Sequence, residues 1–227
     1  MRSPDLSHIE AVFFDLDGTL IDTAPDFILA VNRLRAEHDL VPLADDQVRP
    51  HVSNGSLGLI TNCFNFTNEV EFEIARERLL DLYFEVDHTE STLFEGAEKF
   101  LKKLESLEIP WGIVTNKPVR YADPLIDRLD LRARMVCLLC PDHVKKRKPD
   151  PESLFLAASR AKIPSEKCFY LGDHLRDIDA GKEASMLTGS VAFGYIPAGL
   201  DPLHWNADYH FSSFEHIYNT FFNCDKT

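Results

Sequence analysis

The sequence lacks any apolar run that could span a bilayer, because no window approaches the roughly 20 apolar residues that a transmembrane helix needs. Residues 1–8 also lack an apolar stretch of signal-peptide length. We therefore expect a cytoplasmic protein without a membrane partner. With 44% hydrophobic and 27% charged residues among 227, the chain fits one large globular domain or one domain that carries a smaller insert.

Positive charge is scarce in this chain. It has 24 Lys and Arg against 37 Asp and Glu, which gives a formal net charge of −13. This excess of negative charge disfavours nucleic acid and an anionic membrane surface as partners. A small anionic substrate remains compatible with it, because a bound metal and one or two well-placed cations can reverse the local field.

Cysteine is infrequent as well. Its five positions are odd in number and lie in apolar contexts, which indicates reduced thiols: Cys63, Cys137, Cys140, Cys168 and Cys224. Cys137 and Cys140 have the spacing C-x-x-C, but the surrounding sequence predicts a strand, on which positions i and i+3 point to opposite faces. We therefore predict core or strand-end cysteines there, and neither a shared metal site nor a redox pair.

The chain does contain short apolar runs that alternate with amphipathic helical patterns. Strands are expected at residues 11–14, 111–114, 135–140, 168–171, 191–193 and 209–211. Such alternation predicts an α/β fold, with a Rossmann-like parallel sheet and helices on both of its faces.

One long segment departs from this alternation. Residues 22–90 show helical periodicity and no convincing strand, and Ser53 to Ser56 are expected to form a tight loop between two of the helices. We expect residues 1–21 and 91–227 to form the α/β core. Residues 22–90 would then be a small all-α cap domain inserted after the first strand.

Polar residues stand where three of the expected strands end. In chain order they are Asp15 and Asp17, Thr115 and Asn116, and Asp173. The carboxyl ends of neighbouring parallel strands lie side by side, about 4.8 Å apart, so we expect these residues in one cleft. Acids as close as Asp15 and Asp17 repel each other, and a divalent cation is a simple compensation. The alternative is an ordinary Asp-Gly turn after the first strand.

Two further charged features fit the same cleft. Asp177 stands four residues after Asp173, so both acids fall on one helical face and can hold a hard cation. Alternatively, Asp177 only complements the helix dipole. Residues 145–149, Lys-Lys-Arg-Lys-Pro, are either a solvated basic run or the source of one lysine that balances the carboxylates and binds a phosphate oxygen. Position alone does not select that lysine.

Four ordered motifs resemble those of the haloacid dehalogenase-like phosphohydrolases, and the resemblance covers essentially the whole chain. They are Asp15-Leu16-Asp17-Gly18-Thr19, Thr115-Asn116, Lys148-Pro149 and Gly172-Asp173-x-x-x-Asp177. The helical insert is similar to the small α-helical cap of that family. Within the family the chain resembles phosphoglycolate phosphatases. Residues 111–120, 140–145, 194–196 and 204–205 are closer to the N-acetylmuramic acid 6-phosphate phosphatases of bacterial cell-wall (peptidoglycan) recycling.

This resemblance implies an Mg²⁺-dependent phosphomonoester hydrolase that forms an aspartyl-phosphate intermediate. Asp15 would be the nucleophile and Asp17 the general acid and base. Thr115 and Lys148 would complete the catalytic set and, with Asn116, would bind the phosphoryl group. The Mg²⁺ ligands would be Asp15, Asp17 through its backbone carbonyl, Asp173 and Asp177.

Substrate specificity is expected from the cap, because the core residues already serve phosphate and metal. Arg49, Asn54 and Ser56 are candidates for substrate contact, although each is equally plausible as a surface or packing residue. The expected substrate is N-acetylmuramic acid 6-phosphate, with phosphoglycolate as the alternative, so the partner is a small phosphorylated sugar or organic acid. A sugar phosphomutase and a non-catalytic phosphoacceptor regulator rank lower, and the absence of lysine from residues 24–90 disfavours a phosphonatase. We expect a monomer or a small homo-oligomer.

Overall fold

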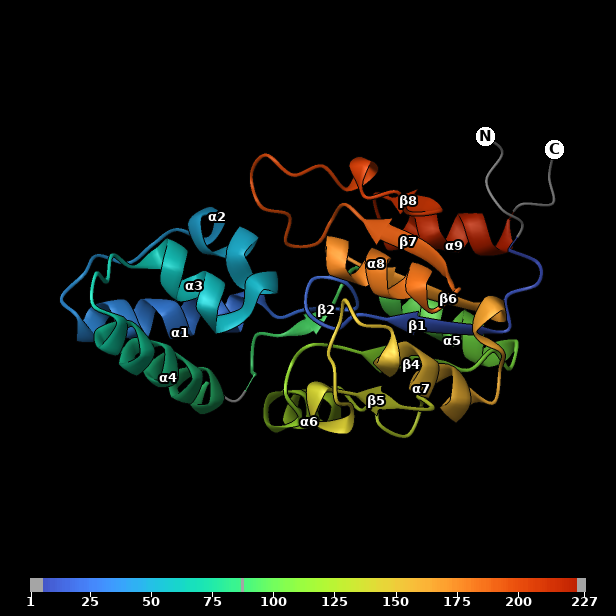
Figure 1. The fold of residues 1–227 in the computed structure, drawn as a ribbon, viewed down its shortest axis with the longest axis horizontal. Helices are drawn as coiled ribbons and strands as arrows, with labels where there is room; N and C mark the ends of the chain where they lie inside the picture. The colour runs from blue at the N-terminus through green and yellow to red at the C-terminus, as the bar shows by residue number, and fades with distance from the viewer. Residues whose placement is uncertain (1–5, 87, 224–227) are drawn as a thin grey trace.

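A six-stranded parallel sheet forms the centre of the larger of two lobes in the computed structural model, which describes residues 6–86 and 88–223 (Figure 1). The strands follow the order β5-β4-β1-β6-β7-β8. Their bounds are β1 Ala11–Phe14, β4 Trp111–Val114, β5 Leu138–Leu139, β6 Cys168–Gly172, β7 Leu187–Val191 and β8 Tyr209–Phe211. Each strand pairs with its neighbours in parallel, which confirms the predicted α/β fold.

Strand β1 is buried on both faces, since it lies between β4 and β6 and all four of its residues are apolar. Successive side chains on a strand point to opposite faces. Val12 and Phe14 therefore pack into a first hydrophobic cluster, and Ala11 and Phe13 pack into a second one across the sheet. The next residue, Asp15, is polar and lies directly after the strand, at the edge of the sheet.

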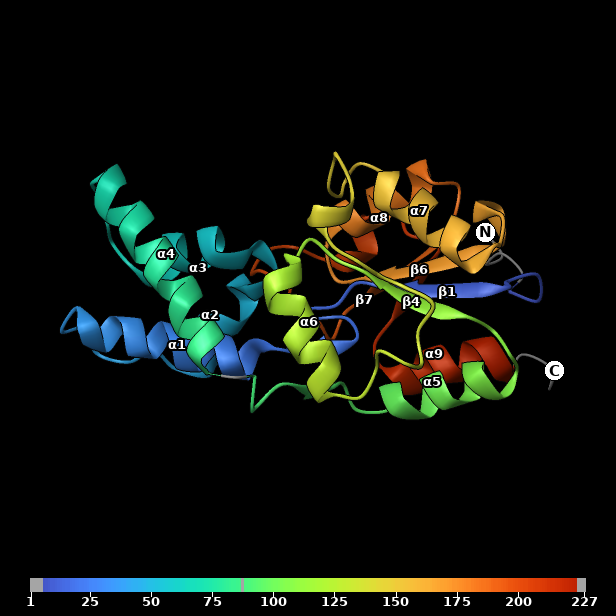
Figure 2. The same ribbon diagram turned by 90° about the horizontal axis from the view of Figure 1, so that it is seen from below.

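Helices cover both faces of the sheet (Figure 2). The first cluster receives side chains from α5 (Ala97–Ser106), α6 (Val119–Arg128) and α9 (Phe214–Phe222). The second receives them from α7 (Glu152–Ala161) and α8 (Leu175–Glu183). Within the described ranges, no helix combines the length and the apolar character that crossing a membrane requires.

The smaller lobe, which we call the cap, holds the helices that lie between residues 22 and 92 in the sequence (Figure 1). They are α1 (Ala24–Glu37), α2 (Asp45–Val48), the 3-10 helix η1 (Arg49–Asn54), α3 (Gly55–Cys63) and α4 (Glu69–Glu85). Their apolar faces form a separate core that includes Leu34, Leu59 and Leu79, all fully buried.

A short ribbon connects the two lobes. Strands β2 (Ile21–Asp22) and β3 (Thr92–Leu93) pair antiparallel where the chain enters and leaves the cap. The sequence pattern does not predict this ribbon, because two residues are too few for an alternation of apolar and polar positions to show.

Three predictions about local structure are wrong. The strand expected at 191–193 runs from Leu187 to Val191, and the strand expected at 135–140 is limited to Leu138–Leu139. Ser53 to Ser56 do not form a loop between helices, since η1 ends at Asn54 and α3 begins at Gly55. Gly55 has a φ of +63°, a left-handed conformation that suits glycine and lets the two helices follow each other directly.

The composition of β7 explains why the sequence pattern does not predict its bounds. Its centre, Thr188-Gly189-Ser190, has the composition of a turn, yet it is buried in the sheet. A Cβ at Gly189 would approach side-chain atoms of Leu171 and Phe211 to 2.8 Å. Glycine is therefore needed here for packing between neighbouring strands.

The cysteines behave as predicted in the described part of the chain. Cys137 packs against the second cluster and Cys140 lies in the first, so the two thiols are on opposite faces of the sheet. Cys63, Cys137, Cys140 and Cys168 are free thiols, and burial raises the pKa of Cys137 and Cys140 to about 12. Cys224 lies outside the described residues.

Replacement of Phe14 by alanine should destabilise the core. Its fully buried ring has edge contacts with Phe100 and Trp111, at centroid distances of 6.2 and 6.3 Å, and alanine would leave a cavity there. We expect a loss of about 3–5 kcal/mol in the free energy of unfolding in urea. Phe155→Ala is the matched control, because that ring is 48% exposed on α7 and its loss should cost at most about 0.5 kcal/mol. Equal losses in the two variants would contradict the assignment of this core.

Candidate active site

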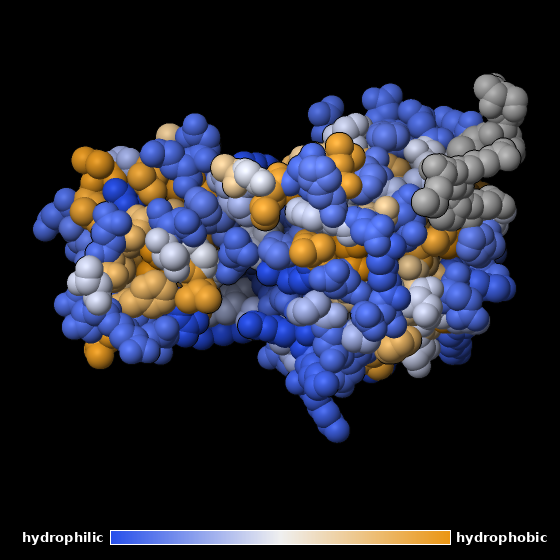
Figure 3. Space-filling view, turned by 45° about the horizontal axis from the view of Figure 1, so that its top comes forward, coloured by the Kyte–Doolittle hydropathy of each residue, from blue (hydrophilic) through white to orange (hydrophobic). Residues whose placement is uncertain are grey.

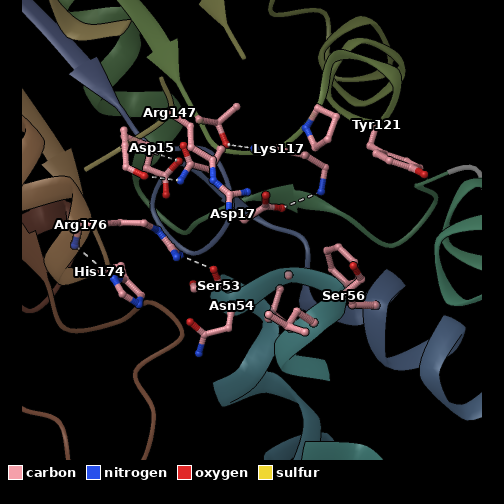
Figure 4. A pocket seen from close by; sticks show the side chains of 18 of the residues that line it. Asp15, Asp17, Ser53, Asn54, Ser56, Lys117, Tyr121, Arg147, His174 and Arg176 are labelled. Carbon is pink, nitrogen blue, oxygen red and sulfur yellow. Dashed lines mark hydrogen bonds and ion pairs between the residues drawn. The ribbon is translucent and has the colours of Figure 1, made fainter. Parts of the chain in front are cut away.

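The carboxyl ends of three neighbouring strands bring distant residues to one edge of the sheet. Asp15 follows β1, Thr115 follows β4 and Asp173 follows β6. This edge faces the cap, and Figure 3 shows a hollow with hydrophilic residues between the lobes. A cavity of about 790 Å³ lies there, and its lining includes Asp15, Asp17 and Thr115 from the core and Asn54 and Ser56 from the cap (Figure 4).

Three buried carboxylates form the centre of the site. Asp15, Asp173 and Asp177 can each offer an oxygen atom, and these atoms lie within 4.8 Å of one another. Burial, together with the charges of Asp15 and Asp177, raises the pKa of Asp173 well above its usual value. Burial also raises the pKa of Asp177, although Lys148 opposes this shift.

This cluster fits a divalent metal ion. The Oδ1 atom of Asp173 is buried and has no hydrogen-bond partner among the described residues. An unpartnered oxygen beside two further carboxylates supplies the hard, anionic ligands that such a cation prefers. Asp17 is predicted to bind the ion through its backbone carbonyl, and its carboxylate is not part of this cluster.

Lys148 provides the positive charge within the cluster. Its side chain is completely buried, and Nζ lies 3.0 Å from Asp15 Oδ1 and 2.7 Å from Asp177 Oδ1. The same Nζ donates to the Val114 carbonyl at 2.8 Å and to the Tyr170 hydroxyl at 2.6 Å. One lysine thus connects two of the three acids, and the remaining negative charge is left for another cation.

Asp17 has different surroundings from Asp15. Its Oδ1 accepts a hydrogen bond from Thr23 Oγ1 at 2.5 Å and one from Lys117 Nζ at 2.9 Å. Lys117 is buried, donates to the hydroxyl of Tyr83 on α4 at 2.9 Å, and lies 4.7 Å from the ring centroid of Phe27 on α1. The ammonium group therefore connects Asp17 to two helices of the cap.

Asp173 is in direct contact with the cap as well. Its Oδ2 accepts hydrogen bonds from Ser53 Oγ at 2.7 Å and from the Tyr195 backbone N–H at 2.9 Å. Arg176, which precedes Asp177 on α8, donates to the Ser53 carbonyl (Figure 4). Gly18 makes this packing possible, since a Cβ at its φ of +80° would come within 2.1 Å of Asp173 Oδ2.

The remaining predicted residues differ in their placement. Thr115 Oγ1 accepts from the Lys117 backbone N–H at 3.0 Å, and Asn116 Nδ2 donates to the Lys148 carbonyl at 2.9 Å. Arg49 does not line the cavity: it pairs with Asp22 Oδ2 at 2.5 Å and lies over the ring of Tyr195. The structure therefore places Arg49 at the connection between the lobes, beside the β2–β3 ribbon.

Several lining residues are absent from the sequence-based set. They are chiefly Ser53, Tyr83, Lys117, Tyr121, Arg147, His174 and Arg176. Lys117 could have been suspected, because it directly follows Thr115-Asn116 at a strand end. Burial and the nearby Arg176 lower the pKa of His174 to about 4, so its ring is neutral at pH 7.

Comparison with known families agrees with this geometry. The family described as haloacid dehalogenase-like hydrolase matches residues 12–191, which include all four motifs. The chain belongs to this family. The resemblance inferred from the motifs is therefore confirmed.

Curated relatives and solved structures of similar fold cover nearly the whole chain. N-acetylmuramic acid 6-phosphate phosphatase of Pseudomonas aeruginosa is 42% identical over 201 residues, 88% of this chain and 89% of that protein. Phosphoglycolate phosphatase of Xanthomonas campestris is 38% identical over 198 residues, 87% of this chain and 90% of that protein. A crystal structure described as a predicted phosphoglycolate phosphatase of Haemophilus somnus has a TM-score of 0.81 at 21% identity and covers 95% of this chain and 99% of that one. The names of the two curated relatives confirm the prediction of a phosphoric monoester hydrolase.

The substitution Asp173→Asn should stabilise the metal-free protein and weaken its affinity for divalent cations. At neutral pH the wild type must either bury an uncompensated carboxylate or take up a proton, whereas asparagine is neutral and can still accept both hydrogen bonds. In EDTA we expect a gain of about 1–3 kcal/mol in the free energy of unfolding. Because the raised pKa makes the wild type lose stability as pH rises above about 4, this gain should grow with pH.

Thermal melting with and without Mg²⁺ and titration calorimetry measure these two effects. The Mg²⁺-induced rise in Tm should be smaller in Asp173→Asn than in the wild type. Asp179→Asn is the control, because Asp179 is exposed on the same helix, α8. A variant Asp173→Asn that is less stable than the wild type in EDTA would contradict the assigned repulsion.

Proposed function

We propose that this phosphatase hydrolyses N-acetylmuramic acid 6-phosphate through an aspartyl-phosphate formed on Asp15. The observation that carries the mechanism is the contrast between Asp15 and Asp17 in one cavity. Asp15 lies against Lys148 in the carboxylate cluster, whereas Asp17 faces the cap beside Thr23 and Lys117. Two acids in such different surroundings suit two different chemical roles.

Asp15 is the proposed nucleophile. Among the described residues, its hydrogen-bonding contacts are both on Oδ1, from the Leu16 backbone N–H at 2.8 Å and from Lys148 at 3.0 Å. This leaves Oδ2 available to attack phosphorus, and the bond between phosphorus and the sugar oxygen breaks as the new bond forms. Lys148 and the hydroxyl of Thr115 would stabilise the negative charge of the transferring phosphoryl group.

Asp17 is the proposed proton carrier. It would give a proton to the departing sugar oxygen and then take one from the water that attacks the aspartyl-phosphate, so that phosphate leaves and Asp15 is regenerated. General acid and base catalysis of this kind contributes about 10²–10⁴-fold. Thr23 and Lys117 hold the Asp17 carboxylate at the side of the cavity that faces the cap.

Mg²⁺ is the proposed ion at Asp15, Asp173 and Asp177, with the backbone carbonyl of Asp17 as a further ligand. The carboxylate oxygens and the unpartnered Asp173 Oδ1 support this choice. When bound, Mg²⁺ would neutralise charge on the phosphoryl oxygens and on the attacking carboxylate.

The size of the cavity supports a sugar phosphate over a two-carbon acid. About 790 Å³ is within the range of sites that enclose a molecule much larger than phosphoglycolate. Asn54 and Ser56 line it from the cap and could bind the sugar. In this proposal residues 1–21 and 91–227 carry out the chemistry, and residues 22–90 select the substrate, which places the enzyme in cell-wall recycling. Cytoplasmic localisation and a monomer or small homo-oligomer remain predictions.

Asp15→Asn should abolish phosphomonoester hydrolysis. An amide cannot form the phosphoenzyme, so we expect kcat to fall by about 10⁴-fold or more. Hydrolysis of an aryl phosphate in the presence of Mg²⁺ measures this loss, and mass spectrometry of the acid-quenched wild type should locate phosphate on Asp15. Substantial residual activity, or activity that EDTA does not affect, would exclude the mechanism.

N-acetylmuramic acid 6-phosphate should be a better substrate than phosphoglycolate. The sugar ring can contact cap residues that a two-carbon acid does not reach, and a few such contacts correspond to a difference of at least about 10-fold in kcat/KM. Side-by-side values for both compounds and for several hexose phosphates test this expectation. A wide margin in favour of phosphoglycolate would support the alternative substrate.

A further inference from the structure

Five lysine and arginine side chains line the cavity between the lobes within the described ranges. Four of them already have partners. Lys148 contacts Asp15 and Asp177, Lys117 contacts Asp17, Arg76 pairs with Glu73 at 2.6 Å, and Arg176 donates to the Ser53 carbonyl. The fifth is Arg147, whose guanidinium group has neither an acidic nor a carbonyl partner in the described part of the chain.

The backbone that carries Arg147 is nevertheless firmly held. The Glu152 carboxylate accepts from the backbone N–H groups of Lys145 and Lys146, at 3.1 and 3.0 Å. Asn116 donates to the Lys148 carbonyl, and the Asp150 N–H donates to the carbonyl of Arg147 itself at 3.1 Å. These hydrogen bonds fix the backbone of Arg147 at the cavity wall. The side chain of Arg147 is exposed and can bind a ligand.

Arg147 is adjacent in sequence to the lysine that contacts the proposed nucleophile, Asp15. It directly precedes Lys148, whose Nζ lies 3.0 Å from Asp15. Figure 4 shows it on the same side of the pocket as Asp15 and Lys117, while Arg176 and His174 lie on another side. An unpaired guanidinium group in a chain of net charge −13 is a strong attractant for an anion, and its planar fork matches a carboxylate with two hydrogen bonds.

We infer that Arg147 binds a carboxylate group of the substrate, so that the enzyme prefers phosphomonoesters that also carry a carboxylate. This inference rests on the proposed phosphatase function and deepens it, because it defines the substrate class by a second anionic group. The proposed partners of the phosphoryl group are Lys148 and Thr115, and Arg147 lines the same cavity with a guanidinium group that has no partner among the described residues, so it is available for a second charge. The substrates in the names of both curated relatives, N-acetylmuramic acid 6-phosphate and phosphoglycolate, combine a phosphate with a carboxylate.

Pairs of substrates of which only one member carries a carboxylate test this inference. N-acetylmuramic acid 6-phosphate is compared with N-acetylglucosamine 6-phosphate, and phosphoglycolate with ethyl phosphate. For each pair the ratio of kcat/KM values is measured in the wild type and in Arg147→Gln. We expect the preference for the carboxylate member to fall by about 10- to 100-fold, as for the loss of a hydrogen-bonded charged contact.

Two further variants separate the specific contact from a general effect of charge. Lys146→Gln removes the same charge from the neighbouring residue, which pairs with Asp150 and does not line the cavity, so the ratio should remain that of the wild type. Arg147→Lys keeps the charge but loses the planar fork, and its ratio should lie between those of the wild type and Arg147→Gln. Thermal melting establishes that all three variants are folded.

The outcomes distinguish this inference from the proposed function. A fall in the ratio for the sugar pair supports both. A fall for the glycolate pair alone, in an enzyme that prefers phosphoglycolate, supports the role of Arg147 and overturns the proposed substrate. If Arg147→Gln lowers kcat/KM equally for both members of each pair, or if Lys146→Gln has the same effect, the inference is wrong and the proposed function is unaffected. A wild type that does not discriminate within either pair also overturns it.

Discussion

The contact of Lys148 with Asp15 and Asp177 is the interaction on which the site depends. Three carboxylates lie within 4.8 Å of one another in a buried position, and such a cluster is unfavourable unless cations compensate it. Lys148 compensates it in part, since its ammonium group contacts two of the acids and two neutral oxygens. The residual negative charge suits the cluster to a divalent cation. The cluster forms because β1 and β6 are adjacent and end at the same edge of the sheet.

The cap takes part in this electrostatic arrangement. Ser53 donates to Asp173, and Tyr83 accepts from the same Lys117 ammonium group that contacts Asp17. The carboxylate cluster and the proposed proton carrier are therefore each connected to a cap residue by hydrogen bonds. A substrate that moves the cap would therefore change the surroundings of both Asp173 and Asp17.

Much of the core could be predicted because the relevant signals are local. An apolar run that ends in Asp15 or Asp173 marks a strand end, and parallel strands bring such ends together without knowledge of side-chain contacts. Ser53 and Lys117 could not be placed in this way. Their roles depend on contacts such as Ser53 with Asp173 and Lys117 with Tyr83, which are set by how the cap packs on the core. The bounds of strand β7 could not be predicted for a different reason, since Gly189 is needed there for packing between strands, yet glycine is typical of turns.

Arg147 shows how the structure resolves a pattern that the sequence leaves ambiguous. The run Lys145 to Lys148 could be a solvated basic patch or a source of one phosphate-binding lysine. In the folded chain its members separate. Lys146 pairs with Asp150 at the surface and Lys148 is buried among carboxylates, whereas the side chain of Arg147 lines the cavity with no partner among the described residues. Glu152 and Asn116 fix the backbone on either side of Arg147 through hydrogen bonds. As a result, the side chains of three adjacent basic residues lie in solvent, in the cavity and in the core, and they meet different partners. A single basic segment can therefore serve both the phosphoryl group and a second anion of the substrate.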